Sequence, residues 1–181
     1  MFAAFHAPLY FLSPPILWRN WAIYLEPIEG IVLGPWAGFS AAFVGSIIGR
    51  MIKPDVFWVF GIIAEPLSVL MVAFLVQRQW LPVFVTYSVM LAAYFSHPFG
   101  KSLPLWTILD VLLAFALIYP VAKLSRIGVQ GDKRCLTVSL VLVSFIGTVT
   151  DSLTRVFLFV PAGLYAFLGL SFDELFVIFT T

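Results

Sequence analysis

Six apolar segments, each 16 to 24 residues long, follow one another along this chain and constrain its fold more than any other feature. A helix needs about 20 mostly apolar residues to cross the hydrocarbon core of a bilayer. Hydrophobic residues make up 62% of the chain and charged residues only 10%, whereas a soluble domain carries about 25% charged residues. The sequence therefore predicts an all-α, polytopic integral membrane protein with about six transmembrane helices in one bundle. The segments are residues 16–33, 35–52, 57–77, 81–96, 103–122 and 136–159.

The length of 181 residues fits a single transmembrane helical domain, residues 1–181, with no separate soluble domain. Residues 2–12 are apolar but shorter than a span, and the sequence leaves open whether they cross the membrane. It also leaves open whether the natural chain continues past residue 181. The start of the chain lacks a basic region and a small-residue cleavage site, so a cleaved signal peptide is not expected.

Several function classes lack their sequence signals. The net charge of +1 does not favour a nucleic-acid partner. The chain has no P-loop, no G-x-S-x-G and no H-E-x-x-H motif, which counts against an ATPase, a serine hydrolase and a metalloprotease. Cys135 is the single cysteine, and His6 and His97 are the only histidines, in different segments. We therefore expect no disulfide within the chain, no metal site and no cofactor.

Glycine, proline and short polar residues mark the predicted helix boundaries. Gly34-Pro35 predicts a tight turn or a kink, because proline is tolerated in the first turn of a helix but not in its interior. His97-Pro98 predicts the end of a helix at an interface. Ser171 and Glu174 have the spacing of a capping box, which predicts the start of a short final helix.

The distribution of cations predicts the orientation of the bundle. Cytoplasmic loops of membrane proteins are enriched in lysine and arginine, so the polar loop at residues 123–134 is expected in the cytoplasm. Alternation of the spans then places five cations inside and three outside. The inner cations are Arg78, Lys123, Arg126, Lys133 and Arg134, and the outer ones are Arg50, Lys53 and Lys101. With this orientation, most ionisable residues within the spans fall in the outer half of the membrane, which suggests a polar cavity open to the outside.

Two pairs of ionisable residues have helical spacing. Glu26 and Glu29 are three apart and share a helix face, either to bind a cationic substrate or ion or to pair with Arg50 or Arg155 and lock helices together. Asp151 and Arg155 are four apart and can form an ion pair within one helix. Alternatively, the guanidinium group of Arg155 suits a substrate carboxylate or phosphate.

Three further charges have two interpretations each. Arg50 ends a helix, where a cation is favourable and where its side chain can also extend to the interface. Asp110 either lines the cavity or locks helices, and Glu65, which precedes a proline, has a structural or a proton-switching role. A charge at membrane depth costs at least about 2.5–3.5 kcal/mol, so each is a candidate functional residue.

Small residues recur at every fourth position of the segment 35–52 and form two adjacent rows. In lipid, such rows let another helix backbone approach closely. We expect this face to pack against a helix of the same protein or of a partner subunit. Its candidate packing and docking residues are Gly34, Gly38, Ala41, Gly45 and Gly49.

Two stretches resemble a known family. They are EPIEGIVLGPWAGFSAAFVGSIIGRMI, in which an L-G-P-x-x-G-F turn enters a small-residue helix, and FIGTVTDSLTRVFLFVPAGLY. Both are similar to the substrate-binding S components of energy-coupling factor transporters. The resemblance implies six transmembrane helices and a small-molecule site, often for a vitamin, open to the outside. It also implies a transmembrane coupling subunit and two cytoplasmic ATPases as partners, with Ala3 and Ala7 at the spacing of the family's docking motif.

The sequence thus favours a non-enzymatic, multi-pass component of the cell membrane that binds a vitamin or another small solute for uptake. One alternative is a structural subunit of a larger membrane complex, and another is a small lipid-processing or intramembrane enzyme that uses Asp110 and Asp151. The identity of the substrate, the partner subunits and the oligomeric state stay open. The expected substrate-binding residues are Glu26, Glu29, Arg50, Asp110, Asp151 and Arg155.

Overall fold

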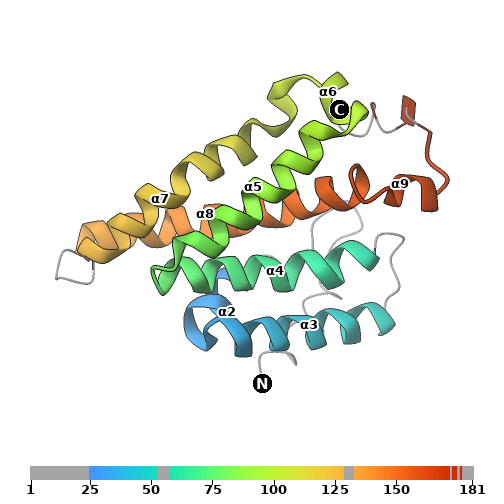
Figure 1. Cartoon of the computed structure of the whole chain (residues 1–181). Coiled ribbons are helices and arrows are strands. Elements are labelled where there is room, and N and C mark those ends of the chain that lie inside the picture. Colours follow the sequence, from blue (N-terminus) through green and yellow to red (C-terminus); the bar gives the residue numbers. More distant parts are fainter. Residues whose placement is uncertain (1–24, 53–57, 129–132, 172, 175, 177–181) are drawn as a thin grey trace.

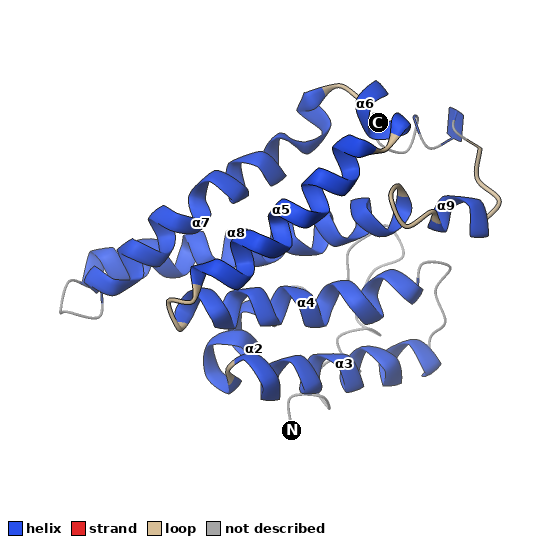
Figure 2. Ribbon diagram, viewed as in Figure 1, coloured by secondary structure: helices blue, strands red, loops and turns tan. Residues whose placement is uncertain are grey.

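The computed structural model describes residues 25–52, 58–128, 133–171, 173–174 and 176, and these residues form helices joined by short turns, without strands (Figure 2). The predicted all-α class is therefore confirmed. The helices are α2 (Glu26–Leu33), α3 (Pro35–Ile52), α4 (Trp58–Val76), α5 (Trp80–Ser96), α6 (Pro98–Ser102), η2 (Leu105–Ile108, a 3-10 turn), α7 (Leu109–Gly128), α8 (Lys133–Phe159) and α9 (Leu164–Phe167). The predicted segment 2–12, most of the segment 16–33, and the residues His6, Ala3, Ala7, Arg19 and Lys53 lie outside the described residues.

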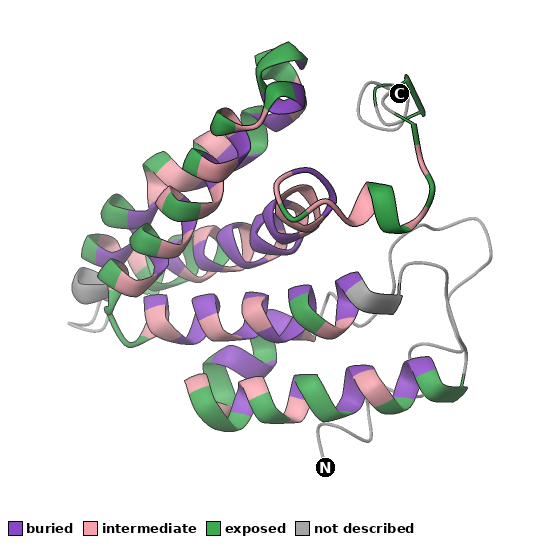
Figure 3. Ribbon diagram, turned by 45° about the vertical axis from the view of Figure 1, so that its right-hand side comes forward, coloured by how far each residue is buried: buried purple, intermediate pink, exposed green. Residues whose placement is uncertain are grey.

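Helices α4 and α8 form the centre of the bundle. Both contact α2 on one side and α5 and α7 on the other, and α3 packs along α4 (Figure 1). Long helices that follow one another in the chain run in alternating directions, as expected for short connections. Buried residues concentrate on α4 and α8, while α3, α5 and α7 carry exposed residues on their outer faces (Figure 3).

The ends of the long helices lie at two opposite ends of the bundle (Figure 1). The turn at Gly34-Pro35, the turn at Arg78, the C-terminal end of α7 and the N-terminal end of α8 lie at one end of the bundle (Figure 1). The C-terminal ends of α3, α5 and α8 lie at the opposite end, together with α6. We refer to the first end as the basic end, because Arg78, Lys123 and Lys133 are found there.

Among the described residues, two helical stretches are long and apolar enough to cross a membrane, Leu105–Leu124 and Lys133–Phe159. Two further apolar helical stretches, Phe60–Val76 and Trp80–Ser96, are shorter than a full span by the same measure. The outer faces carry large exposed hydrophobic side chains, such as Val89, Leu113 and Val141. These features indicate association with a membrane.

Glycines on three helices allow those helices to approach α4 closely. A Cβ atom on Gly30 of α2 would lie 2.7 Å from the carbonyl oxygen of Val69, and one on Gly38 of α3 would lie 2.8 Å from the Val69 side chain. A Cβ atom on Gly147 of α8 would overlap the side chain of Val72. All three contacts fall on Val69 and Val72, so α2, α3 and α8 meet at one turn of α4. A residue larger than glycine would not fit at any of the three positions.

Hydrogen bonds to the backbone of α8 hold it against its neighbours. The hydroxyl of Ser68 on α4 donates to the carbonyl oxygen of Gly147 (2.8 Å). The hydroxyl of Tyr87 on α5 donates to the carbonyl oxygen of Ile146 (2.9 Å) and lies 2.9 Å from the hydroxyl of Thr150. These buried hydrogen bonds join α4 and α5 to α8, and all of the groups involved are neutral.

The predicted helix boundaries at glycine, proline and the capping box are confirmed. Gly34 has φ +76° and ψ −177°, a conformation open essentially to glycine alone, and it separates α2 from α3. Helix α5 ends before His97, whose Nδ1 accepts from the N–H of Phe99 (3.3 Å) and so caps α6. The N–H and hydroxyl of Ser171 donate to Glu174 Oε2 at 2.8 and 2.9 Å, which completes the capping box.

Candidate functional site

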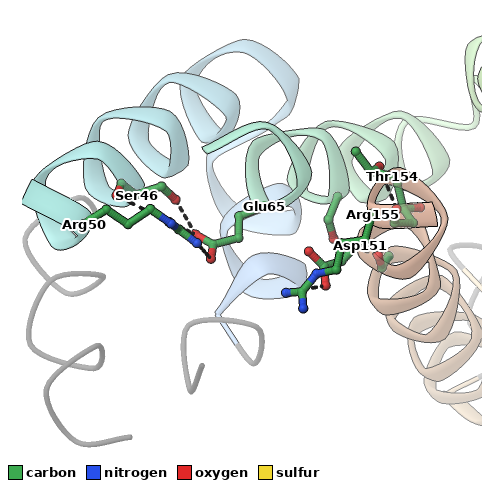
Figure 4. A network of polar contacts seen from close by, with 9 residues as sticks. Ser46, Arg50, Glu65, Asp151, Thr154 and Arg155 are labelled. Atoms are coloured by element: carbon green, nitrogen blue, oxygen red, sulfur yellow. Dashed lines mark hydrogen bonds and ion pairs between the residues drawn. The ribbon is translucent and has the colours of Figure 1, made fainter. Parts of the chain in front are cut away.

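Charged side chains from four helices gather inside the bundle, away from the basic end. The ion pairs and hydrogen bonds among several of them are drawn in Figure 4. We define the charged cluster as Glu26 of α2, Arg50 of α3, Glu65 of α4, and Asp151 and Arg155 of α8. Four of these five residues are buried, and Arg155 is partly exposed.

Arg50 turns into the bundle and joins α3 to α4. Its Nη2 lies 2.7 Å from Glu65 Oε1, and the exposed fractions of the two side chains are 7% and 4%. Its Nη1 donates to the carbonyl oxygen of Ser46 (3.3 Å), and the Ser46 hydroxyl donates to Glu65 Oε2. Arg50 therefore does not extend to the membrane interface, which was one of its two predicted positions.

Gly61 on α4 provides the space that the Arg50 side chain occupies. A Cβ atom at position 61 would overlap Nη2 of Arg50. Glycine at this position thus lets the guanidinium group pass over the backbone of α4 and reach Glu65, four residues further along the same helix face.

Asp151 and Arg155 form the ion pair predicted from their spacing. The distance between Arg155 Nη2 and Asp151 Oδ2 is 3.0 Å, and the pair lies within α8. The exposed fraction is 1% for the Asp151 side chain and 35% for that of Arg155. Arg155 is therefore the rim of the charged cluster, and Asp151 lies beneath it.

Glu26 differs from the other members of the charged cluster. Only 1% of the residue is exposed, and within the described part of the chain neither carboxylate oxygen has a hydrogen-bond partner. Its carboxylate is within electrostatic range of Asp151, Glu65 and Arg155. The Ser68 side chain is also close, but the Ser68 hydroxyl donates its proton to the carbonyl oxygen of Gly147.

The remaining predicted binding residues have different positions. Glu29 is fully buried, one helical turn beyond Glu26 on α2. Asp110 is exposed near the start of α7, and its Oδ1 accepts from the N–H of Val111 (2.9 Å). Asp110 therefore does not belong to the charged cluster, and the expectation that it faces a common cavity with Asp151 has no support in its position.

Among the predicted packing residues, Gly38 packs against Val69 of α4 within the same protein. Gly38, Gly45 and Gly49 are buried, and α3 and α4 make one of the most extensive helix contacts of the bundle. Ala41 is half-buried on the side of α3, and Gly34 forms the turn before it. Of the two predicted uses of the small-residue face, packing inside the protein is shown at Gly38.

Sequence reasoning did not place Glu65 among the binding residues, and it treated Ser46 only as a small residue. A signal for both was present. Glu65 lies deep in an apolar segment and needs a cation or a hydrogen-bond donor there. Ser46 lies four residues before Arg50, on the same face of the predicted helix. The sequence did not show which cation would turn inwards.

Within the described residues, no group of three or more histidine, cysteine, aspartate and glutamate side chains is arranged to hold a metal ion. Comparisons of this chain with protein-family models, with curated proteins and with solved structures found no match. The charged cluster is therefore interpreted from its own geometry.

Proposed function

We propose that this chain is the substrate-binding membrane component of a transporter for a small solute, of the energy-coupling factor type, and that it catalyses no reaction itself. The observation that carries the proposal is the charged cluster. Each charge held at membrane depth costs at least about 2.5–3.5 kcal/mol. The two ion pairs account for four of the five charges, whereas Glu26 has no role in helix packing that its contacts explain.

The arrangement of the helices supports a multi-pass topology in the cell membrane. The long helices α3, α4, α5, α7 and α8 alternate in direction, and the sequence segment 16–33 supplies the sixth span of the proposal. The positive-inside rule then places the basic end in the cytoplasm. The rim of the charged cluster at Arg155 consequently faces the outside, where a solute would enter.

The position of Glu65 supports a site within the membrane. Glu65 is 11 residues before the end of α4 at Val76, which corresponds to about 16 Å of helix. Glu65 is thus roughly midway between the two ends of a bundle that crosses a membrane about 30 Å thick. Binding sites of membrane transporters are commonly found at this depth.

A structural subunit of a larger membrane complex is the second candidate, and the Arg50–Glu65 pair favours it. This pair joins two helices and acts as a lock whether or not a solute binds. Glu26 distinguishes the two candidates. A purely structural role does not explain why a buried carboxylate has no hydrogen-bond partner among the described residues.

Native mass spectrometry of the purified chain tests the proposal. We expect a retained small molecule in the wild type, and we expect co-expression with an energy-coupling module to yield a complex that contains a coupling subunit and ATPases. Purification of a fixed complex without ATPases and without any small molecule would instead support the structural subunit.

A further inference from the structure

Glu26 is a buried carboxylate that accepts no hydrogen bond from the described residues. Two charge-neutral pairs, Arg50–Glu65 and Arg155–Asp151, flank it. The charged cluster has three carboxylates and two guanidinium groups, so its formal charge is 2 − 3 = −1. Because each arginine already contacts another carboxylate, Glu26 is the acidic residue of the cluster without an arginine contact.

A carboxylate in this position calls for a cation that carries N–H donors. An ionised carboxylate only accepts hydrogen bonds, with two oxygens and about four lone pairs. Both Glu26 oxygens are buried and without a hydrogen bond among the described residues. Burial of such a group without a partner costs several kcal/mol, and a charge-assisted N⁺–H···O⁻ bond is the strongest hydrogen bond that can offset this cost.

The geometry points to Glu26 as the group that binds the cationic nitrogen of a small organic substrate, an inference that rests on the proposed transport function. Ca²⁺ or Mg²⁺ needs about six or more oxygen ligands, whereas Glu65 and Asp151 already accept from arginines. An ammonium group needs only one carboxylate and fits the two oxygens that Glu26 presents.

Arg155 is the member of the charged cluster that reaches the surface. Of the five residues of the charged cluster, it has by far the largest exposed fraction, and it acts electrostatically on both Asp151 and Glu26. Its guanidinium group already provides a cation at this edge of the cluster.

The test measures the thermal unfolding midpoint of the full chain in detergent, in methylammonium chloride and in sodium chloride at equal ionic strength. A ligand that binds only the folded state raises this midpoint. We expect methylammonium to raise it above the sodium value in the wild type and in Asp110→Asn, which removes an exposed carboxylate outside the cluster. In Glu26→Gln we expect the apparent affinity for methylammonium to fall about tenfold to a hundredfold, the range for loss of a charged hydrogen bond.

Equal midpoints in the two salts for the wild type, or the same methylammonium effect in Glu26→Gln, would overturn the inference. Mass spectrometry of the small molecules retained by the wild type is the second measurement, and it needs no folded variant. A retained amine or quaternary ammonium compound supports the inference. A retained anion, neutral molecule or metal ion overturns it while the transport function stands, whereas retention of nothing together with no methylammonium effect counts against both.

Discussion

Replacement of Arg50 by methionine should destabilise the protein far more than the loss of a surface charge does. The exposed fractions of the Arg50 and Glu65 side chains are 7% and 4%, and their closest atoms are 2.7 Å apart. Arg50→Met introduces an apolar side chain that can still pack in the bundle, but it leaves the Glu65 carboxylate buried without its cation. Removal of one partner of a buried pair costs about 3–5 kcal/mol, whereas an exposed pair contributes about 0–1 kcal/mol.

A double-mutant cycle separates the ion pair from the packing of the side chains. Glu65→Met alone should cost a similar amount, because it leaves the guanidinium group buried. The double variant Arg50→Met with Glu65→Met should lie within about 1 kcal/mol of the wild type or be more stable, since apolar residues often replace a buried pair without loss. The coupling between the two sites should therefore be about 3 kcal/mol or more.

The measurement is equilibrium unfolding in mixed micelles of increasing denaturing-detergent content, followed by circular dichroism. Lys101→Met, which removes an exposed cation on α6, is the control and should change the free energy of unfolding by no more than about 0.5 kcal/mol. A cost below about 1 kcal/mol for Arg50→Met, with additive effects in the double variant, would show that Arg50 extends to the interface and that the buried pair does not form.

Gly34→Ala should cost on the order of 1–3 kcal/mol in the same assay, because Gly34 has φ +76° and ψ −177°. The control is Gly163→Asn, which should be tolerated because Gly163 has φ +74° and nothing near its Cβ position. Similar costs for the two variants would contradict this account. Gly147→Leu should destabilise by about 1–3 kcal/mol or prevent folding, since its side chain would overlap Val72 on α4, and wild-type stability of this variant would refute the close approach of α8. The N–H and then the hydroxyl of Ser171 lower the pKa of the Glu174 carboxyl below its ordinary value. The cap therefore contributes stability above the ordinary pKa and loses it as the pH falls through the lowered pKa. NMR titration of Glu174 checks this, and Ser171→Ala should raise its pKa towards the ordinary value.

The helices themselves could be predicted from the sequence because hydrophobic length and helix breakers act locally. The segment predicted at 35–52 is α3, and those at 57–77 and 81–96 agree with α4 and α5 to within one residue at each end. Helix α7 begins later than predicted, at Leu109, because η2 occupies the preceding residues. The ion pair of Asp151 with Arg155 was also predictable, since helical geometry alone brings positions i and i+4 together.

Contacts between helices could not be predicted in the same way. Arg50 has a choice between the interface and the interior, and the structure shows that Gly61 on another helix decides it by leaving space for the guanidinium group. Asp110 has equally apolar surroundings in the sequence, yet it is exposed on α7 and bonds to the N–H of Val111. In each case the outcome depends on the rotation of a helix about its axis, which hydropathy does not specify.

Two kinds of polar contact hold the helices of the bundle together, an ion pair and neutral hydrogen bonds. Helix α3 is held to α4 by a charged pair in a buried environment, whereas α8 is held to α4 and α5 by neutral hydrogen bonds from Ser68 and Tyr87. Charge-assisted hydrogen bonds are roughly twice as strong as neutral ones. Loss of one polar contact should therefore cost more between α3 and α4 than between α8 and its neighbours. Since Asp151 and Arg155 both belong to α8, their ion pair does not depend on any contact between helices.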